Sequence, residues 1–201
     1  MMDIRDLNNV SKGKLITLEG IDGAGKSTMI ELLKESKRLP DSTVFTREPA
    51  KGTFTGDFVY KSFEKNLNPI SELFLFMADH ADHLNNVVKP AIEDGKLVIS
   101  DRYTDSRICY QGATLQNVID NSVEFIEQIH KPWSVVPDLT FYLDLSPEIS
   151  MNRCSERDEL TKFERKDFLE KVRTNFLNLA KKYPNRIKVI DATKSQSEIL
   201  E

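Results

Sequence analysis

The chain has 201 residues, of which 39% are apolar and 30% are charged, so it is long enough to bury one substantial core. Its 28 basic and 32 acidic side chains give a net charge of −4, which argues against a general nucleic-acid binder. The polar N-terminus is unlike a signal peptide, no apolar run approaches the roughly 20 residues that span a bilayer, and the two cysteines are typical of free thiols in a reducing compartment. We therefore expect a cytoplasmic protein with no nucleic-acid or membrane partner.

The first predicted strand, Lys14–Leu18, leads into a glycine-rich loop and then into a helix at Ser27–Lys37. The loop sequence, GIDGAGKS over residues 20–27, fits the phosphate-binding pattern G-x-x-x-x-G-K-[ST]. Glycines let successive backbone N–H groups face one centre, where they and the helix N-terminus hold phosphate oxygens. The residues expected to bind nucleotide phosphates are Gly20, Ile21, Asp22, Gly23, Ala24, Gly25, Lys26, Ser27 and Thr28.

Three side chains of this loop have distinct expected roles. Lys26 places a positive charge at the β- and γ-phosphates, and the Ser27 hydroxyl can ligate Mg²⁺. Asp22 adds a negative charge where phosphates bind. It is therefore either a turn aspartate that faces solvent or a residue that binds a hydroxyl of a second substrate.

The second predicted strand, Thr43–Thr46, is followed by Arg47, Glu48 and Pro49. Because Pro49 biases Glu48 away from the helical conformation, Arg47 is held at the edge of the sheet. There it is either an exposed surface arginine or a fork that binds a phosphate.

A long helix is expected next, from Pro69 to Asp94, with a kink at Pro90. Phe76 and His80 lie four residues apart on one face of this helix. They either pack in the core or form a flat pocket for a nucleobase.

The third predicted strand, Leu97–Ser100, ends beside Asp101 and Arg102. The Asp101 carboxylate is placed to reach Mg²⁺ directly or through water, and Arg102 to clamp a phosphate. The alternative is a structural ion pair between the two residues.

The last predicted elements carry a cluster of basic residues. Arg153 and Arg157 are spaced i, i+4 and begin a charge-dense segment that extends to Lys166. This segment is either a solvated helix end or a lid that brings arginines to transferring phosphates. The predicted elements are helices at Asn117–His130, Ile149–Cys154 and Phe163–Lys182 and strands at Leu139–Leu143 and Ile187–Ile190.

Strands that alternate with helices predict an α/β, three-layer P-loop NTPase fold, with a five-stranded parallel sheet flanked by helices. We expect one kinase domain over residues 1–201, with a lid near 153–166. Ligands of such folds bind at the carboxyl ends of the strands, so the residues that follow each strand are the candidates for the site.

These motifs, in this order, resemble the thymidylate kinases. The segments that carry the resemblance are residues 18–28 (LEGIDGAGKST), 46–49 (TREP), 101–106 (DRYTDS), 110–112 (YQG), 142–148 (YLDLSPE) and 191–193 (DAT). The resemblance implies a homodimer that transfers the γ-phosphoryl group of ATP to dTMP, giving dTDP, with Mg²⁺.

The resemblance also implies roles for residues of the dTMP site. Arg102, with Arg47 nearby, would bind the dTMP phosphate, and Asp22 would bind the 3′-hydroxyl side of the sugar. Phe76 would stack on the base, and Tyr110 would crowd the 2′ position. The remaining residues expected to line the base site are His80, Ser106 and Gln111.

The chain departs from the family pattern at several positions. His80 stands where the family commonly has an arginine that reads a thymine carbonyl, and Gly23 stands where some members have a basic loop residue. We expect Arg153 and Arg157 to supply that charge instead, as catalytic residues with Lys26 and Arg102. The family's glycine pair after TREP is Ala50-Lys51, and the lid reads Thr161-Lys162 where aspartate-arginine is common.

Two alternative functions remain at this point. His80 motivates a kinase for another nucleoside monophosphate or a deoxynucleoside. A P-loop switch protein is a second alternative, although the chain lacks the N-K-x-D base motif typical of such switches.

Overall fold

The computed structural model describes residues 13–65, 67–154 and 165–201, which form a five-stranded sheet with helices on both faces. The strand order is β2-β3-β1-β4-β5, and every neighbouring pair is parallel. This confirms the α/β class and the five predicted strands, each of which ends one residue beyond its predicted end. The strands are β1 (Lys14–Glu19), β2 (Val44–Arg47), β3 (Leu97–Asp101), β4 (Leu139–Asp144) and β5 (Ile187–Asp191).

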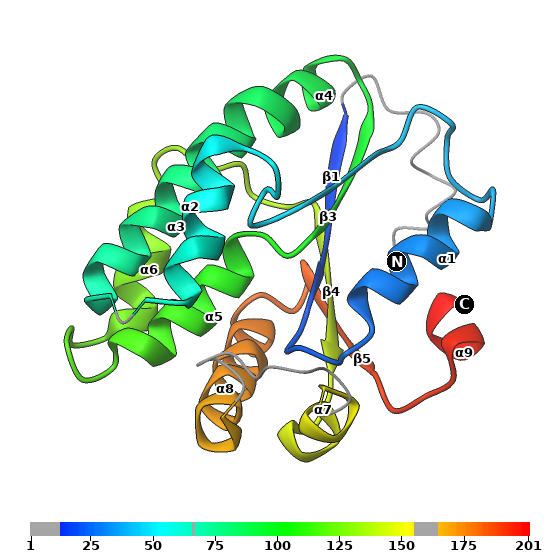
Figure 1. The fold of residues 1–201 in the computed structure, drawn as a ribbon. Helices are drawn as coiled ribbons and strands as arrows, with labels where there is room; N and C mark the ends of the chain where they lie inside the picture. Colours follow the sequence, from blue (N-terminus) through cyan, green and yellow to red (C-terminus); the bar gives the residue numbers. More distant parts are fainter. Residues whose placement is uncertain (1–12, 66, 155–164) are drawn as a thin grey trace.

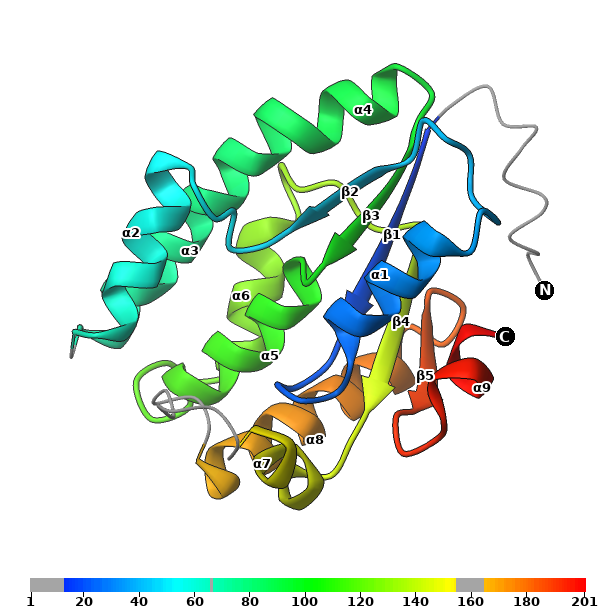
Figure 2. The ribbon, with the colours of Figure 1, turned by 45° about the vertical axis from the view of Figure 1, so that its right-hand side comes forward.

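The helices form two layers (Figure 1). One face of the sheet carries α1 and α9, and the other carries α3, α5, α6 and α8. Figure 2 shows the strands pointing toward one end of the sheet, where the loop after β1 and the helix α7 lie. The helices are α1 (Lys26–Glu35), α2 (Phe54–Phe63), α3 (Pro69–His83), the π-helical turn η2 (Leu84–Val88), α4 (Lys89–Glu93), α5 (Thr104–Leu115), α6 (Ser122–His130), α7 (Pro147–Cys154), α8 (Lys166–Lys182) and α9 (Gln196–Leu200).

The predicted long helix is divided into α3, η2 and α4. Pro90, in the first turn of α4, has no backbone N–H to donate to the preceding turn. The wider π-helical turn at Leu84–Val88 lies directly before this position, where such bulges accommodate a local break in the α-helical hydrogen bonds.

Three helices, α2, α5 and α9, have no counterpart among the predicted elements. In α5 every residue except Thr114 is buried, including charged and polar ones, so no amphipathic stripe marks the helix in the sequence. In α2 the aromatic Phe54 is 79% exposed and Gly56 lies in the first turn, so both pattern and propensity disfavour a helix. The Thr53 side chain caps α2 by accepting a hydrogen bond from the Gly56 N–H.

The central strands are buried on both faces and anchor the sheet in the core. Leu15 of β1 and Val98 of β3 are paired in register and completely buried, and each such side chain contributes about 1.5–3 kcal/mol by leaving water. Thr17 and Thr140 share a buried hydrogen bond of 2.8 Å between β1 and β4. None of the helices in the described ranges has the length and apolar character needed to cross a membrane.

Candidate active site

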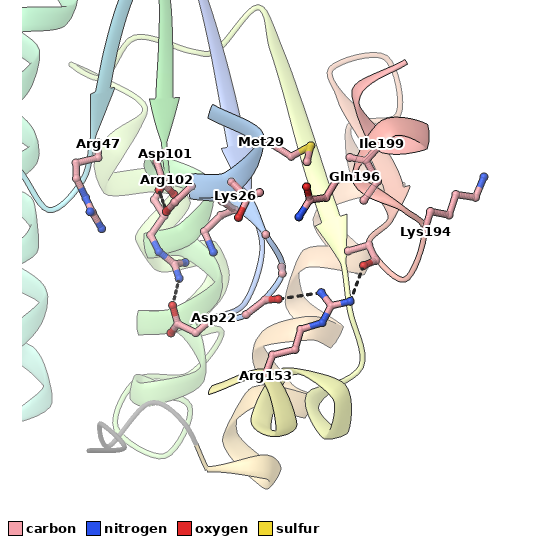
Figure 3. A pocket seen from close by; sticks show the side chains of 16 residues that line it. Asp22, Lys26, Met29, Arg47, Asp101, Arg102, Arg153, Lys194, Gln196 and Ile199 are labelled. Carbon is pink, nitrogen blue, oxygen red and sulfur yellow. Dashed lines mark hydrogen bonds and ion pairs between the residues drawn. The ribbon is translucent and has the colours of Figure 1, made fainter. Parts of the chain in front are cut away.

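The phosphate loop lies between β1 and α1, at the carboxyl end of the sheet (Figure 3). Gly23 and Gly25 have φ angles of 75° and 94°, a left-handed backbone that residues with side chains rarely adopt. The loop forms one wall of a cavity of about 620 Å³, whose other walls come from β2, β3, α7 and α9. The cavity therefore has the volume typical of a small-molecule site.

Lys26 is held inside the loop. Its Nζ donates hydrogen bonds to the carbonyl oxygens of Gly20 and Ile21, each at 3.0 Å. Burial, with a smaller contribution from the neighbouring Arg102 cation, lowers the pKa of Lys26 to about 8. An anionic phosphate beside this ammonium group would favour its charged form, so Lys26 is suited to bind phosphate.

Ser27 and Asp101 meet at the point where β3 ends beside α1. The Ser27 hydroxyl donates a hydrogen bond of 2.9 Å to Asp101 Oδ2. The other carboxylate oxygen, Oδ1, is buried and has no hydrogen-bond partner among the residues that the structure describes. A hydroxyl next to a carboxylate with an unused oxygen fits Mg²⁺, which takes oxygen ligands and retains several waters.

Arg102 follows β3 in a left-handed conformation, with φ of 68°. Its Nη2 donates to Asp22 Oδ1 at 2.7 Å and its Nη1 to the Gly20 carbonyl oxygen at 2.9 Å. The guanidinium carbon lies 5.1 Å from the centre of the Tyr110 ring. The ion pair considered between Asp101 and Arg102 is not found, because Arg102 turns across the phosphate loop to Asp22 (Figure 3).

Glu19, the last residue of β1, is a buried carboxylate that sequence reasoning missed. It accepts a hydrogen bond from the Ser106 hydroxyl, and Ser106 also accepts from Arg102 Nη1 at 3.3 Å. Burial, together with the negative charge of Asp105, raises the pKa of Glu19 to about 8. Its position directly before the phosphate loop is the feature of the sequence that could have identified Glu19.

Two further arginines line the cavity. Arg47 is exposed at the end of β2 and makes no ion pair within the described ranges. Arg153 of α7 donates from Nη1 to the Gly23 carbonyl oxygen at 3.0 Å and from Nη2 to the Ala192 carbonyl oxygen at 3.3 Å (Figure 3). Arg153 thus joins the phosphate loop to the end of β5, whereas Arg157 lies outside the described residues, together with most of the expected lid.

The cavity has another wall that sequence reasoning did not assign. Met29 of α1 approaches it from one side, and Lys194, Gln196 and Ile199 approach it from the C-terminal segment (Figure 3). The residues of this wall lie close to the loop only because β5 places the end of the chain beside α1. No local motif marks them.

Apart from Asp22, which lines this cavity, the expected base and sugar residues lie on α3 and α5, beyond its walls. Phe76 is half-buried, with its ring 6.1 Å from the Phe63 ring. Tyr110 and Gln111 are buried on α5, and Tyr110 reaches the cavity region through its contact with Arg102.

The comparisons with known proteins agree with this arrangement. A family model described as "Thymidylate kinase" matches residues 18–201. The chain belongs to the thymidylate kinase family. It is 52% identical to a "Probable thymidylate kinase" of Methanosarcina acetivorans over 94% of this chain and 92% of that protein, and 46% identical to one of Natronomonas pharaonis over 93% of each. Among solved structures, it resembles a thymidylate kinase from Ehrlichia chaffeensis with a TM-score of 0.69 and 34% identity, over 89% of this chain and 93% of that one.

His80, which was expected to line the base site, lies in a buried hydrogen-bond network. His80 has no exposed surface, and both its ring nitrogens have protein partners. Nδ1 lies 2.8 Å from Glu48 Oε1, and Nε2 lies 2.8 Å from the Ser134 hydroxyl. In this arrangement neither ring nitrogen of His80 is free to contact a base, so the structure favours the core-packing alternative for His80. The physical reason is the buried Glu48 carboxylate, which recruits the histidine.

Glu48 is the centre of this second buried network, which we call the Glu48 cluster (Glu48, His80, His83, Arg107 and His130). His83 Nδ1 lies 2.6 Å from Glu48 Oε1, and Arg107 Nη1 donates to Glu48 Oε2. Burial alone would raise the pKa of Glu48, but the Arg107 cation and His80 hold it well below its usual range. Burial lowers the pKa of His80 to about 4 and that of His130 to about 3, so both rings are neutral near pH 7.

Proposed function

We propose that this protein transfers the γ-phosphoryl group of ATP to dTMP, giving dTDP, by direct in-line displacement. One observation carries the proposal. A single cavity brings together the phosphate loop with Lys26 and the arginines Arg47 and Arg102. Several cations in one cavity suit two phosphate groups that must approach each other, one from the donor and one from the acceptor.

The chain's own residues supply positioning and charge. Lys26 neutralises the β- and γ-phosphates, and Arg153, anchored at Gly23, adds positive charge beside the transferring group. Because Gly23 stands where some family members have a basic residue, Arg153 and Arg157 take that part. This chemistry requires little covalent participation by the protein, so a precise arrangement of donors is the main source of rate enhancement.

Ser27 and Asp101 are the residues that would hold Mg²⁺. Asp101 Oδ1, which has no hydrogen-bond partner in the described part of the chain, and the adjacent Ser27 hydroxyl provide oxygen atoms at the point where the phosphates would lie. Mg²⁺ held by these residues would neutralise negative charge that develops during the transfer.

The acceptor extends from the cavity toward α3 and α5. Arg102 binds its phosphate, and Asp22 receives the 3′-hydroxyl side of the sugar. Tyr110, whose ring lies beside Arg102, crowds the 2′ position and disfavours ribonucleotides. Phe76 stacks on the base, and Ser106 and Gln111 complete its surroundings.

We further propose that the protein is a cytoplasmic homodimer with one kinase domain and a lid near residues 153–166. An exposed apolar surface on α2 and α3 supports the dimer, since Phe54, Phe58 and Phe74 are 79%, 46% and 62% exposed. Light scattering after size exclusion tests it, and a monomer at micromolar concentration contradicts it.

A panel of acceptors tests the proposed function. Purified protein is assayed with ATP, Mg²⁺ and dTMP, dUMP, dCMP, dGMP or thymidine, and kcat/KM is compared. The highest value is expected with dTMP. A higher kcat/KM with any other acceptor would show that dTMP is not the preferred substrate. Nucleotide hydrolysis that is stimulated by a protein but not by dTMP would indicate a switch protein instead of a kinase. Membership of the family favours neither outcome.

A further inference from the structure

We infer that Arg107 of α5 reads a carbonyl oxygen of the pyrimidine base, taking over the part that His80 cannot perform. The inference deepens the proposed function and rests on it. It concerns a residue to which the sequence analysis assigned no role.

The first observation is an unused donor. Arg107 Nε donates to His130 Nε2 at 3.1 Å, and Nη1 donates to Glu48. The remaining nitrogen, Nη2, is buried and has no hydrogen-bond partner in the described part of the chain. Buried donors of native proteins nearly always have partners, so a buried one without a partner indicates a missing acceptor.

The second observation is where this donor lies. His80 and Arg107 both bind the Glu48 carboxylate. Arg47 precedes Glu48 in the sequence, and the Asp101 carbonyl oxygen accepts a hydrogen bond from the Glu48 N–H. Both Arg47 and Asp101 line the phosphate cavity. Phe76 precedes His80 by about one helical turn on α3. The guanidinium group therefore lies close to His80 on α3, about one helical turn from Phe76, on which the base is proposed to stack.

The third observation concerns charge. Glu48 and Arg107 are 1% and 3% exposed and form an ion pair, so their charges cancel. Such a pair has little attraction for a phosphate, unlike Arg47 and Arg102 in the cavity. A free N–H of a neutralised guanidinium group suits a neutral acceptor instead, such as a base carbonyl.

The chemistry of arginine makes the contact selective. A guanidinium group donates hydrogen bonds and cannot accept them. It therefore pairs with the carbonyl groups of thymine and uracil, but it opposes the amino group that cytosine carries at position 4. A contact at position 4 would accordingly favour dTMP and dUMP over dCMP, whereas a contact at position 2 would not, because cytosine also carries a carbonyl there.

The test removes the acceptor and the donor in turn. Wild-type protein, Arg107→Gln and Arg107→Lys are assayed with dTMP, 2-thio-dTMP and 4-thio-dTMP, because a thiocarbonyl sulfur is a weak acceptor. In Arg107→Lys the single nitrogen remains with Glu48, which preserves a cation in the buried pair. We expect the wild type to lose about tenfold in kcat/KM with one thio analogue, the size of effect typical of a hydrogen bond to a charged donor. Both variants should show nearly equal values for dTMP and that analogue.

A matched control separates reading the base from supporting the fold. Ser134→Ala removes the hydrogen bond to His80 Nε2 without touching Arg107. It should lower stability yet leave the thio-analogue ratio at the wild-type value.

Two results would overturn the inference while leaving dTMP kinase activity intact. One is equal kcat/KM of the wild type for dTMP and both thio analogues, a measurement that needs no variant. The other is a wild-type ratio that persists in the Arg107 variants, which would mean that water or protein satisfies Nη2. Absence of wild-type activity on dTMP would instead overturn the proposed function, and the inference with it.

Discussion

Replacing the Glu48 carboxylate with an amide should destabilise the protein strongly. The Glu48 side chain is 1% exposed and accepts hydrogen bonds from Arg107 and from two histidines. In Glu48→Gln, the amide nitrogen would face groups that themselves donate, and the Arg107 cation would remain buried without a counter-charge. Breaking a buried ion pair from one side typically costs about 3–5 kcal/mol. We therefore expect a loss of at least about 3 kcal/mol, a large part of the stability of an ordinary domain.

Urea denaturation measures this loss, and Trp133, whose ring lies 5.1 Å from the His80 ring, provides a fluorescence signal from the cluster itself. The matched control is Glu31→Gln, because Glu31 also pairs with a cation, Lys34, at 2.8 Å, but its side chain is 65% exposed. That control should change stability by less than about 1 kcal/mol. A loss below about 1 kcal/mol in Glu48→Gln, with an unchanged denaturant slope, would refute the view that this carboxylate organises the α3–α5 side of the molecule.

Three further predictions follow from the site and the cluster. Lys26→Ala should lower kcat at least about 10²-fold, the cost of losing one preorganised donor, and a steady-state rate within threefold of wild type would remove Lys26 from catalysis. Arg153→Ala should lower kcat more than it raises KM, whereas the reverse pattern would make Arg153 an ATP-binding residue only. Stability should fall as the pH is lowered from about 6.5 to 5, because His80 and His130, with folded pKa values of about 4 and about 3, bind protons in the unfolded chain first, and these two groups outweigh Glu19, whose raised pKa of about 8 acts in the opposite sense. Urea midpoints at pH 7, 6 and 5 check this, and a flat profile would contradict it.

The sheet was predictable because its strands are short apolar runs bounded by turn residues. Such runs carry their signal locally, and Leu97–Asp101 is buried at all five positions. The helix α5 was not predictable in this way. It is enclosed by α3, α6 and α8, so polar residues such as Asp105 and Gln111 are buried beside apolar ones, and the period of 3.6 residues disappears.

The candidate site also contains parts that a local sequence pattern predicts and parts that only the tertiary structure brings together. The phosphate loop could be read from the sequence because its eight residues are contiguous and each has a chemical reason. Arg102 could be assigned from its place after a strand, but its pairing with Asp22 depends on how two strand ends meet. The Glu48 cluster joins four separate elements, and no local pattern announces it. His80 illustrates the consequence, since its position on the helix was right and its partner was not foreseeable.

The two arginines that flank the start of α5 show how an acidic chain can serve an anionic substrate. Arg102 remains at the cavity, paired with an Asp22 that is itself 36% exposed, so an incoming phosphate can compete for the guanidinium group. Arg107 is held by a carboxylate that is almost wholly buried, so its charge is already neutralised. A nucleotide has an anionic phosphate end and a neutral base end. Arg102 is suited to the phosphate end and Arg107 to the base end. Recognition therefore needs local cations with different partners, which is compatible with a net charge of −4.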